Sequence, residues 1–228
     1  MAVAQRPYEN SEAKIFMSSK NLIYELLISR KNTVVCASLA ALLGQPLGAI
    51  AGAPTDQIQS AVEKVTTILK DPKLQGDAKK KELREVVYPK FDFNEMARRS
   101  LGSHWQRRSP EEQREFVRLF TELVESAYMA NLDGYQGEKV VIGGEKQDKE
   151  FAEVNTKIIS KKGEEFTVNY KLHQAANDWK IYDVVIENIS LVNNYRSQFN
   201  RVIAQSSFDE LFRKMKDRQF EAAGKKRT

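Results

Sequence analysis

The sequence is poor in the residue types that build disulfides, metal sites and histidine-based catalytic centres. Of 228 residues, one is cysteine, Cys36, and two are histidine, His104 and His173. Neither histidine has a ligand partner at a metal-binding spacing. The sequence also lacks a G-x-S-x-G motif, a glycine-rich phosphate loop and a motif of paired carboxylates. We therefore predict no catalytic residue, no metal, no cofactor and no enzyme activity.

Long hydrophobic runs and a large charge of one sign are also missing. The longest apolar run, Val34 to Leu43, is far shorter than the roughly 20 residues that a transmembrane helix needs. Charged residues make up 29% of the chain, hydrophobic residues make up 41%, and the net charge is +5. This composition is typical of a soluble globular protein, and so mild a charge gives little support to nucleic-acid binding.

The N-terminal region has the pattern of a secretory signal peptide. Arg30 and Lys31 precede the apolar run, Pro46 interrupts it, and small residues follow up to the A-x-A site that ends at Ala51. We predict a signal peptide over residues 1–51, with Met17 as an alternative start. Its removal also removes Cys36, which leaves a mature protein without disulfides.

The remaining sequence is predicted to form one domain, residues 52–218, followed by a basic tail, residues 219–228. Apolar periodicity predicts helices at 54–69, 77–87, 93–101, 110–132, 191–204 and 208–215. Alternation predicts four strands at 140–142, 151–159, 165–172 and 179–186, with turns at 143–144, 161–163 and 177–178. Because short connections favour antiparallel pairing, the predicted fold is α+β, a four-stranded antiparallel sheet flanked by several helices.

Asp183 is the polar residue that stands out among the predicted strands. Strict alternation places it on one face with Ile181 and Val185, and places Tyr182, Val184 and Ile186 on the other. A carboxylate on a sheet face can act as a general base or can pair with an arginine such as Arg98 or Arg196. We favour the structural role.

Aromatic residues are spread through the predicted helices and strands alike. A single sheet under amphipathic helices can pack closed or can leave a concave apolar pocket. The residue pattern alone is compatible with both arrangements.

Five motifs, in this order and spacing, make the chain resemble the MlaC or toluene-tolerance family of periplasmic phospholipid carriers. They extend from about Pro54 to Phe212. The motifs are Phe91-Asp92-Phe93 with Met96-Ala97-Arg98, Leu101-Gly102-x-x-Trp105, the helix start 109–113, the strand 179–185, and Ser190 to Phe199.

The resemblance implies a freely diffusing monomer in the periplasm whose cargo is a diacyl phospholipid. Its partners would be an outer-membrane lipoprotein–porin complex and an inner-membrane MCE-domain ABC transporter complex of the Mla pathway, which maintains outer-membrane lipid asymmetry. The helices and the sheet would enclose an apolar lipid pocket. The residues expected to line it are Phe116, Phe120, Leu123, Val124, Val168, Tyr170, Val184, Ile186, Tyr195 and Phe199. Arg98 and Arg196 are candidates for contact with the headgroup.

Two alternative functions stay open at this point. One is a small pocketed α+β enzyme with Asp183 or His104 as its base, and the other is a periplasmic adaptor with a packed core that binds proteins and no lipid.

Overall fold

The structure, a computed structural model, describes residues 53–132, 135–217 and 220, all of which belong to one of the two units of the chain. The predicted signal peptide and nearly all of the predicted basic tail lie outside these residues. The helices are α1 (Pro54–Lys70), α2 (Gly76–Val87), η1 (Tyr88–Lys90), α3 (Phe93–Leu101), η2 (Gly102–Arg107), α4 (Pro110–Leu132), α5 (Leu191–Gln205) and α6 (Phe208–Lys216). The strands are β1 (Lys139–Asp148), β2 (Phe151–Ile159), β3 (Glu165–Ala175), β4 (Asp178–Ile186) and β5 (Ile189–Ser190).

Local signals in the sequence mark the start of α4 and the end of α3. Before α4, the Glu112 amide donates to the Ser109 hydroxyl at 3.2 Å and the Ser109 amide donates to the Glu112 carboxylate at 2.7 Å, which is a capping box. Gly102 follows α3 with a φ of 59°, a conformation that glycine adopts without strain. No helix in the described part of the chain is both long and apolar enough to cross a membrane.

The sheet is antiparallel, as predicted, but it has five strands in the order β1-β2-β3-β4-β5 where the sequence predicted four. The additional strand, β5, has two residues, which is too short to show an alternating pattern. The turn before it places Glu187 and Asn188 at φ values of 48° and 64°. Two successive residues with positive φ form the tight turn that joins short antiparallel strands.

The first strand is longer than predicted. Gly143 and Gly144, which we predicted to form a turn, lie inside β1 at a β-bulge between Ile142 and Gly144. The chain reverses instead at Lys149, which has a φ of 52°. A β-bulge inserts one residue without ending the strand, so glycines inside a strand and glycines in a hairpin look alike in the sequence.

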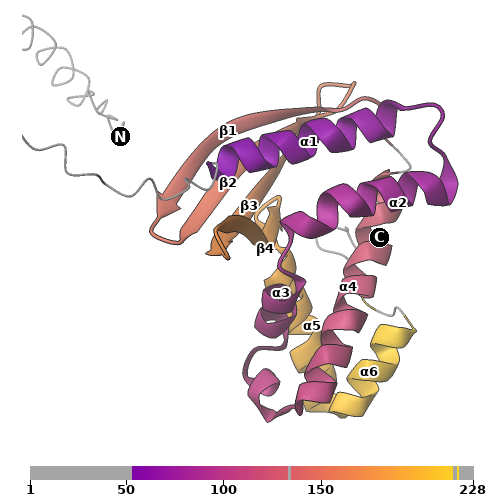
Figure 1. Ribbon diagram of the computed structural model, residues 1–228. Coiled ribbons are helices and arrows are strands. Elements are labelled where there is room, and N and C mark those ends of the chain that lie inside the picture. Colours follow the sequence, from indigo (N-terminus) through magenta and orange to yellow (C-terminus); the bar gives the residue numbers. More distant parts are fainter. Residues whose placement is uncertain (1–52, 133–134, 218–219, 221–228) are drawn as a thin grey trace, which may run out of the picture. The chain divides into compact units, whose positions relative to one another are not determined.

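The hydrophobic residues form two separate clusters. The first joins helices α3, α4, α5 and α6 around buried aromatic side chains. The second lies on the inner face of the sheet, where Ile58 of α1 packs on residues of β2, β3 and β4. Figure 1 shows α1 running across β1 and β2, while α3 to α6 are grouped beyond the other edge of the sheet. The sheet is therefore covered on this face by α1 rather than by the large helical group.

Candidate binding cavity

A cavity of about 430 Å³ lies between α1 and the inner face of the sheet. Its walls come from α1, the end of α2, Phe91 before α3, the segment before β1, and one residue of each of the four long strands. Twelve of the fourteen lining residues are apolar or aromatic, and the other two are Thr66 and Glu138. The lining residues are Ile58, Ala61, Val62, Val65, Thr66, Leu69, Val87, Phe91, Tyr135, Glu138, Val140, Ile158, Tyr170 and Ile181.

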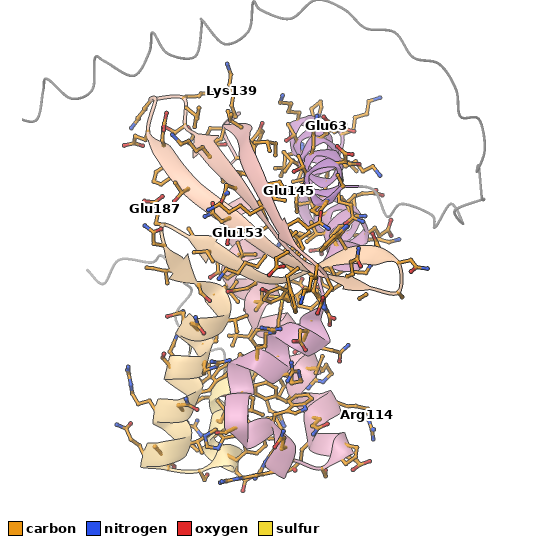
Figure 2. All side chains as sticks on the ribbon, turned by 90° about the vertical axis from the view of Figure 1, so that its left-hand side faces the viewer. Glu63, Arg114, Lys139, Glu145, Glu153 and Glu187 are labelled. Carbon is orange, nitrogen blue, oxygen red and sulfur yellow. The ribbon has the colours of Figure 1, made fainter. Side chains whose placement is uncertain are left out.

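Helix α1 presents an apolar stripe to this cavity. Its cavity residues Ile58, Val62, Val65 and Leu69 are separated by three or four positions, the spacing that places side chains on one side of a helix. The opposite side carries exposed charged residues such as Glu63, which Figure 2 shows pointing away from the sheet. The helix is therefore amphipathic, and its apolar side forms one wall of the cavity.

The sheet wall is shaped by a second β-bulge. In β4, Lys171 pairs with Asp183 while Leu172 pairs with Ile181, so Tyr182 is an additional residue in the strand. Strict alternation placed Ile181 and Val184 on opposite faces. That prediction is wrong, because the bulge brings both into the hydrophobic cluster of the inner face. Ile181 consequently lines the cavity.

The sheet contributes one phenol to the cavity wall. Tyr170 of β3 pairs with Val154 and Val184 of the neighbouring strands and lines the cavity. Burial raises the pKa of the Tyr170 phenol above its ordinary value. The hydroxyl therefore stays neutral at physiological pH, as suits a cavity lined mainly by apolar residues.

The N-terminus of α1 is attached to the sheet by one carboxylate. The Thr55 amide and hydroxyl donate to Oε2 of Glu145 at 2.9 and 2.6 Å. Ala53, at the N-cap position, makes no side-chain capping bond, so Glu145 satisfies an amide that the helix itself leaves unpaired. Figure 2 shows Glu145 between the sheet and α1.

The bulge at Gly143 explains how Glu145 reaches α1. Ile142 pairs with Thr156 and Glu145 pairs with Val154, and both partners are buried on the inner face. Ile142 and Glu145 therefore share a face although they are three positions apart. A Cβ at Gly143 would lie 3.4 Å from the Asn155 carbonyl oxygen, which is van der Waals contact.

One of the ten residues predicted to bind lipid, Tyr170, lines the cavity. Three others, Val168, Val184 and Ile186, belong to the sheet cluster but are not among the lining residues. Their role in lipid binding stays a prediction.

The six helical candidates lie in the other cluster. Phe116, Phe120, Leu123, Val124, Tyr195 and Phe199 pack together with α3 and α6. The Phe116 ring meets Phe199 edge to face at 5.6 Å, and Phe199 stacks on Tyr195 at 5.6 Å. These aromatic side chains fill a closed core, and none of the six lines the cavity. A lipid-binding role for them also stays a prediction.

The two arginines predicted to contact a headgroup make other contacts. Arg98 donates to Glu95 at 2.6 Å from the same helix. The Nε of Arg196 donates to the Arg99 carbonyl oxygen at 2.8 Å. Neither lines the cavity, and headgroup contact by them stays a prediction.

The candidate bases of the enzyme alternative lie away from the cavity. Asp183 accepts from the Ser190 hydroxyl at 2.6 Å and from the Val192 amide at 3.1 Å, so it holds the start of α5 rather than an arginine. His104 lies in η2. Among the described residues, no three acidic, histidine or cysteine side chains are grouped to hold a metal ion.

The sequence reasoning missed the contribution of α1. We predicted this helix and its apolar stripe, but we placed the pocket against α4 and α5, whose aromatic side chains are larger. The feature of the sequence that indicates α1 is the small size of several side chains on its apolar side. Its cavity positions carry Ala61, Val62, Val65 and Thr66, and small residues on an apolar helix face leave space where large ones fill it.

The sequence model of the MlaC family, described as MlaC protein, matches residues 59–217. That range includes the four long strands and most of the cavity wall. The chain belongs to the MlaC family. The described α+β structure agrees with this assignment and with the fold class predicted from the sequence.

Two individual proteins are similar to this member of the MlaC family. The "Intermembrane phospholipid transport system binding protein MlaC" of Haemophilus influenzae is 26% identical over 138 residues, which is 58% of this chain and 64% of that protein. The chain thus matches slightly less than two thirds of the length of that relative. A phospholipid-binding protein from Ralstonia solanacearum, solved in complex with a phospholipid, superimposes with a TM-score of 0.65 at 25% identity, covering 72% of this chain and 94% of that chain.

Proposed function

We propose that the protein is a periplasmic carrier that binds a diacyl phospholipid with its acyl chains in the cavity between α1 and the sheet. The observation that supports this most directly is an apolar cavity in a member of the MlaC family. The bound phospholipid of the similar Ralstonia protein also supports it. In this proposal the protein moves lipid between an outer-membrane lipoprotein–porin complex and an inner-membrane MCE-domain ABC transporter complex.

The size of the cavity indicates how much of a lipid it can hold. A methylene group takes up about as much space as a water molecule, roughly 30 Å³, so a cavity of about 430 Å³ holds on the order of 14 methylenes. At about 0.8 kcal/mol for each methylene, their burial is worth roughly 11 kcal/mol gross. This is the scale of one acyl chain. The second chain of a diacyl lipid requires further space, which α1 would provide by moving away from the sheet.

The same energetics explain why a carrier needs this kind of wall. Moving an acyl chain from a bilayer into water is strongly unfavourable, whereas moving it into an equally apolar cavity is nearly neutral. The protein then needs no chemistry to move its cargo, and we propose no catalytic residue and no cofactor. Contact with a partner can favour release only if the partner binds the lipid-free protein better.

Native mass spectrometry tests the binding step. The full chain, with its N-terminal segment, is expressed in a Gram-negative host and purified without detergent, and the bound lipid is counted and extracted. We expect one diacyl phospholipid for each protein. A lipid-free mass, together with no uptake from labelled phosphatidylethanolamine vesicles, would overturn the proposal and favour the adaptor alternative.

A cavity-filling variant with a matched control locates the lipid. Val62 lines the cavity, whereas Lys64 is exposed on the other side of the same helix. We expect Val62→Trp to lose most of the bound lipid, because its indole occupies the space of the acyl chain, and Lys64→Trp to keep it. Both variants should still unfold cooperatively in urea. Full lipid content in folded Val62→Trp would place the lipid elsewhere.

Delivery is tested separately with the proposed partner. Protein loaded with labelled phospholipid is mixed with the purified inner-membrane MCE-domain complex in nanodiscs. Faster loss of label than with empty nanodiscs is expected. Equal rates would remove the support for exchange with this partner while leaving lipid binding intact.

A further inference from the structure

The polar residues of the cavity wall gather toward one end, which we call the polar end, although apolar lining residues such as Val140 lie there too. Ile58 and Ile181, each 3% exposed, form the apolar end. The polar lining residues Thr66, Tyr135 and Glu138 come from the last turns of α1 and from the segment just before β1. Thr55 bonds to Glu145 near the other end of β1, so α1 runs antiparallel to β1 and brings Thr66 toward Glu138.

Glu138 places a negative charge at the polar end. The Gln136 amide donates to its Oε2 at 2.9 Å, and the Tyr135 hydroxyl donates to its backbone oxygen at 3.4 Å. Hydrogen bonds from backbone amides of its own turn, with Lys161 nearby, lower the pKa of the Glu138 carboxyl. The carboxylate is therefore ionised at physiological pH, and its position is set by the turn.

Lys161 places a positive charge beside it. This residue belongs to the connection between β2 and β3, and its Cε lies 3.4 Å from where a Cβ would stand on Gly137. Its ammonium group forms no ion pair within the described part of the chain, although it is close enough to Glu138 to act on the carboxyl electrostatically. Glu138 thus lines the polar end, while Lys161 is exposed and lies beside this end without being among the lining residues.

We infer that the Glu138 end of the cavity receives the lipid headgroup and prefers a zwitterionic phosphoethanolamine group to an anionic phosphoglycerol group. The acyl chain occupies the apolar end, so the headgroup lies where the lining becomes polar. Its phosphate then meets Lys161 and its ammonium meets Glu138. A phosphoglycerol group has the phosphate but no cation for Glu138, and its net negative charge is repelled by that carboxylate. The inference rests on the proposed lipid binding.

The test is a competition between two lipids. Delipidated full-length protein is incubated with vesicles of equimolar phosphatidylethanolamine and phosphatidylglycerol that carry the same acyl chains, and native mass spectrometry counts each complex. We expect the wild-type protein to take phosphatidylethanolamine about two- to fivefold more often, the range that a solvent-accessible ion pair supports.

Single substitutions test whether Glu138 and Lys161 cause the headgroup preference. Glu138→Gln should bring the ratio close to one at unchanged total occupancy. Lys161→Gln should lower the uptake of both lipids about two- to fivefold, since both have a phosphate. Glu164→Gln and Lys162→Gln alter exposed side chains of the same connection and should behave as the wild type.

The possible results separate this inference from the carrier proposal. Lipid uptake with no headgroup preference, or a preference that Glu138→Gln leaves intact, would overturn the headgroup inference and leave the carrier standing. Unchanged uptake by Lys161→Gln would overturn the assignment of the phosphate. Failure of the wild-type protein to take up either lipid would overturn the carrier proposal itself.

Discussion

The attachment of α1 to the sheet through Glu145 can be removed with one substitution. Glu145→Ala deletes the acceptor of two hydrogen bonds, from the Thr55 amide at 2.9 Å and from its hydroxyl at 2.6 Å. The amide belongs to the first turn of α1, where backbone donors have no partner inside the helix. Because Ala53 provides no side-chain cap, the variant leaves this end of the helix without a protein acceptor.

The expected magnitude follows from the surroundings of the bonds. Loss of a helix N-cap costs about 0.5–2 kcal/mol, but this carboxylate is exposed and water can replace it. We therefore expect Glu145→Ala to lower the free energy of unfolding by about 1 kcal/mol, or roughly 2–4 °C in melting temperature for a chain of this size. Release of lipid should also become faster, because α1 is one wall of the cavity.

A double-mutant cycle with Thr55→Ala isolates this interaction. Urea unfolding of the two single variants and the double variant should give a coupling energy of about 0.5–1 kcal/mol, within the range for residues in direct contact. Additive effects, within the 0.3–0.5 kcal/mol typical of independent sites, would refute the reasoning. Glu150→Ala, in the exposed turn at the end of the same hairpin, serves as the control.

Two further predictions concern the helical part of the molecule. Hydrogen bonds from Arg98 and Arg99 lower the pKa of Glu95 from 4.5 to about 2, so its contribution to stability is present above pH 4.5 and is lost as the pH falls toward 2. Over this interval, the free energy of unfolding of Glu95→Gln should fall less than that of the wild type. Identical curves of unfolding free energy against pH would contradict the pairing. Phe199→Ala should cost about 3–5 kcal/mol of stability, because its ring is fully buried among other rings. Its lipid content for each folded molecule, measured by native mass spectrometry, should match the wild type, and lost lipid would show that the helical core contributes to binding.

In the proposed function, stability and lipid binding belong to different parts of this fold. The helical cluster is closed and aromatic, with Phe116, Phe120 and Phe199 fully buried. The cavity side has smaller apolar residues on α1, which with the end of α2 forms its helical wall. A protein that must open for its cargo can do so at α1 without disturbing the helical core, because the two clusters have separate sets of buried residues.

The sequence predicted those features that depend on neighbours along the chain. The capping box at Ser109 and Glu112, the end of α3 at Gly102 and the antiparallel order of the strands all follow from local chemistry. The family resemblance rested on the order of motifs such as 179–185, and the family match over residues 59–217 confirms it. Turn types were harder, since the glycines at 143–144 form a bulge and not a hairpin.

The tertiary structure alone decided which apolar residues line a cavity and which fill a core. Phe120 and Val62 are both apolar residues on amphipathic helices, yet one is sealed among aromatic rings and the other borders open space. Two bulges, each a single inserted residue, decided that Ile181 and Glu145 face α1. Helix and strand formation depend on the nearest few residues, whereas an empty volume depends on how far apart distant elements come to rest. The sequence therefore determined the elements and the family, and only the packing of α1 on the sheet determined the site.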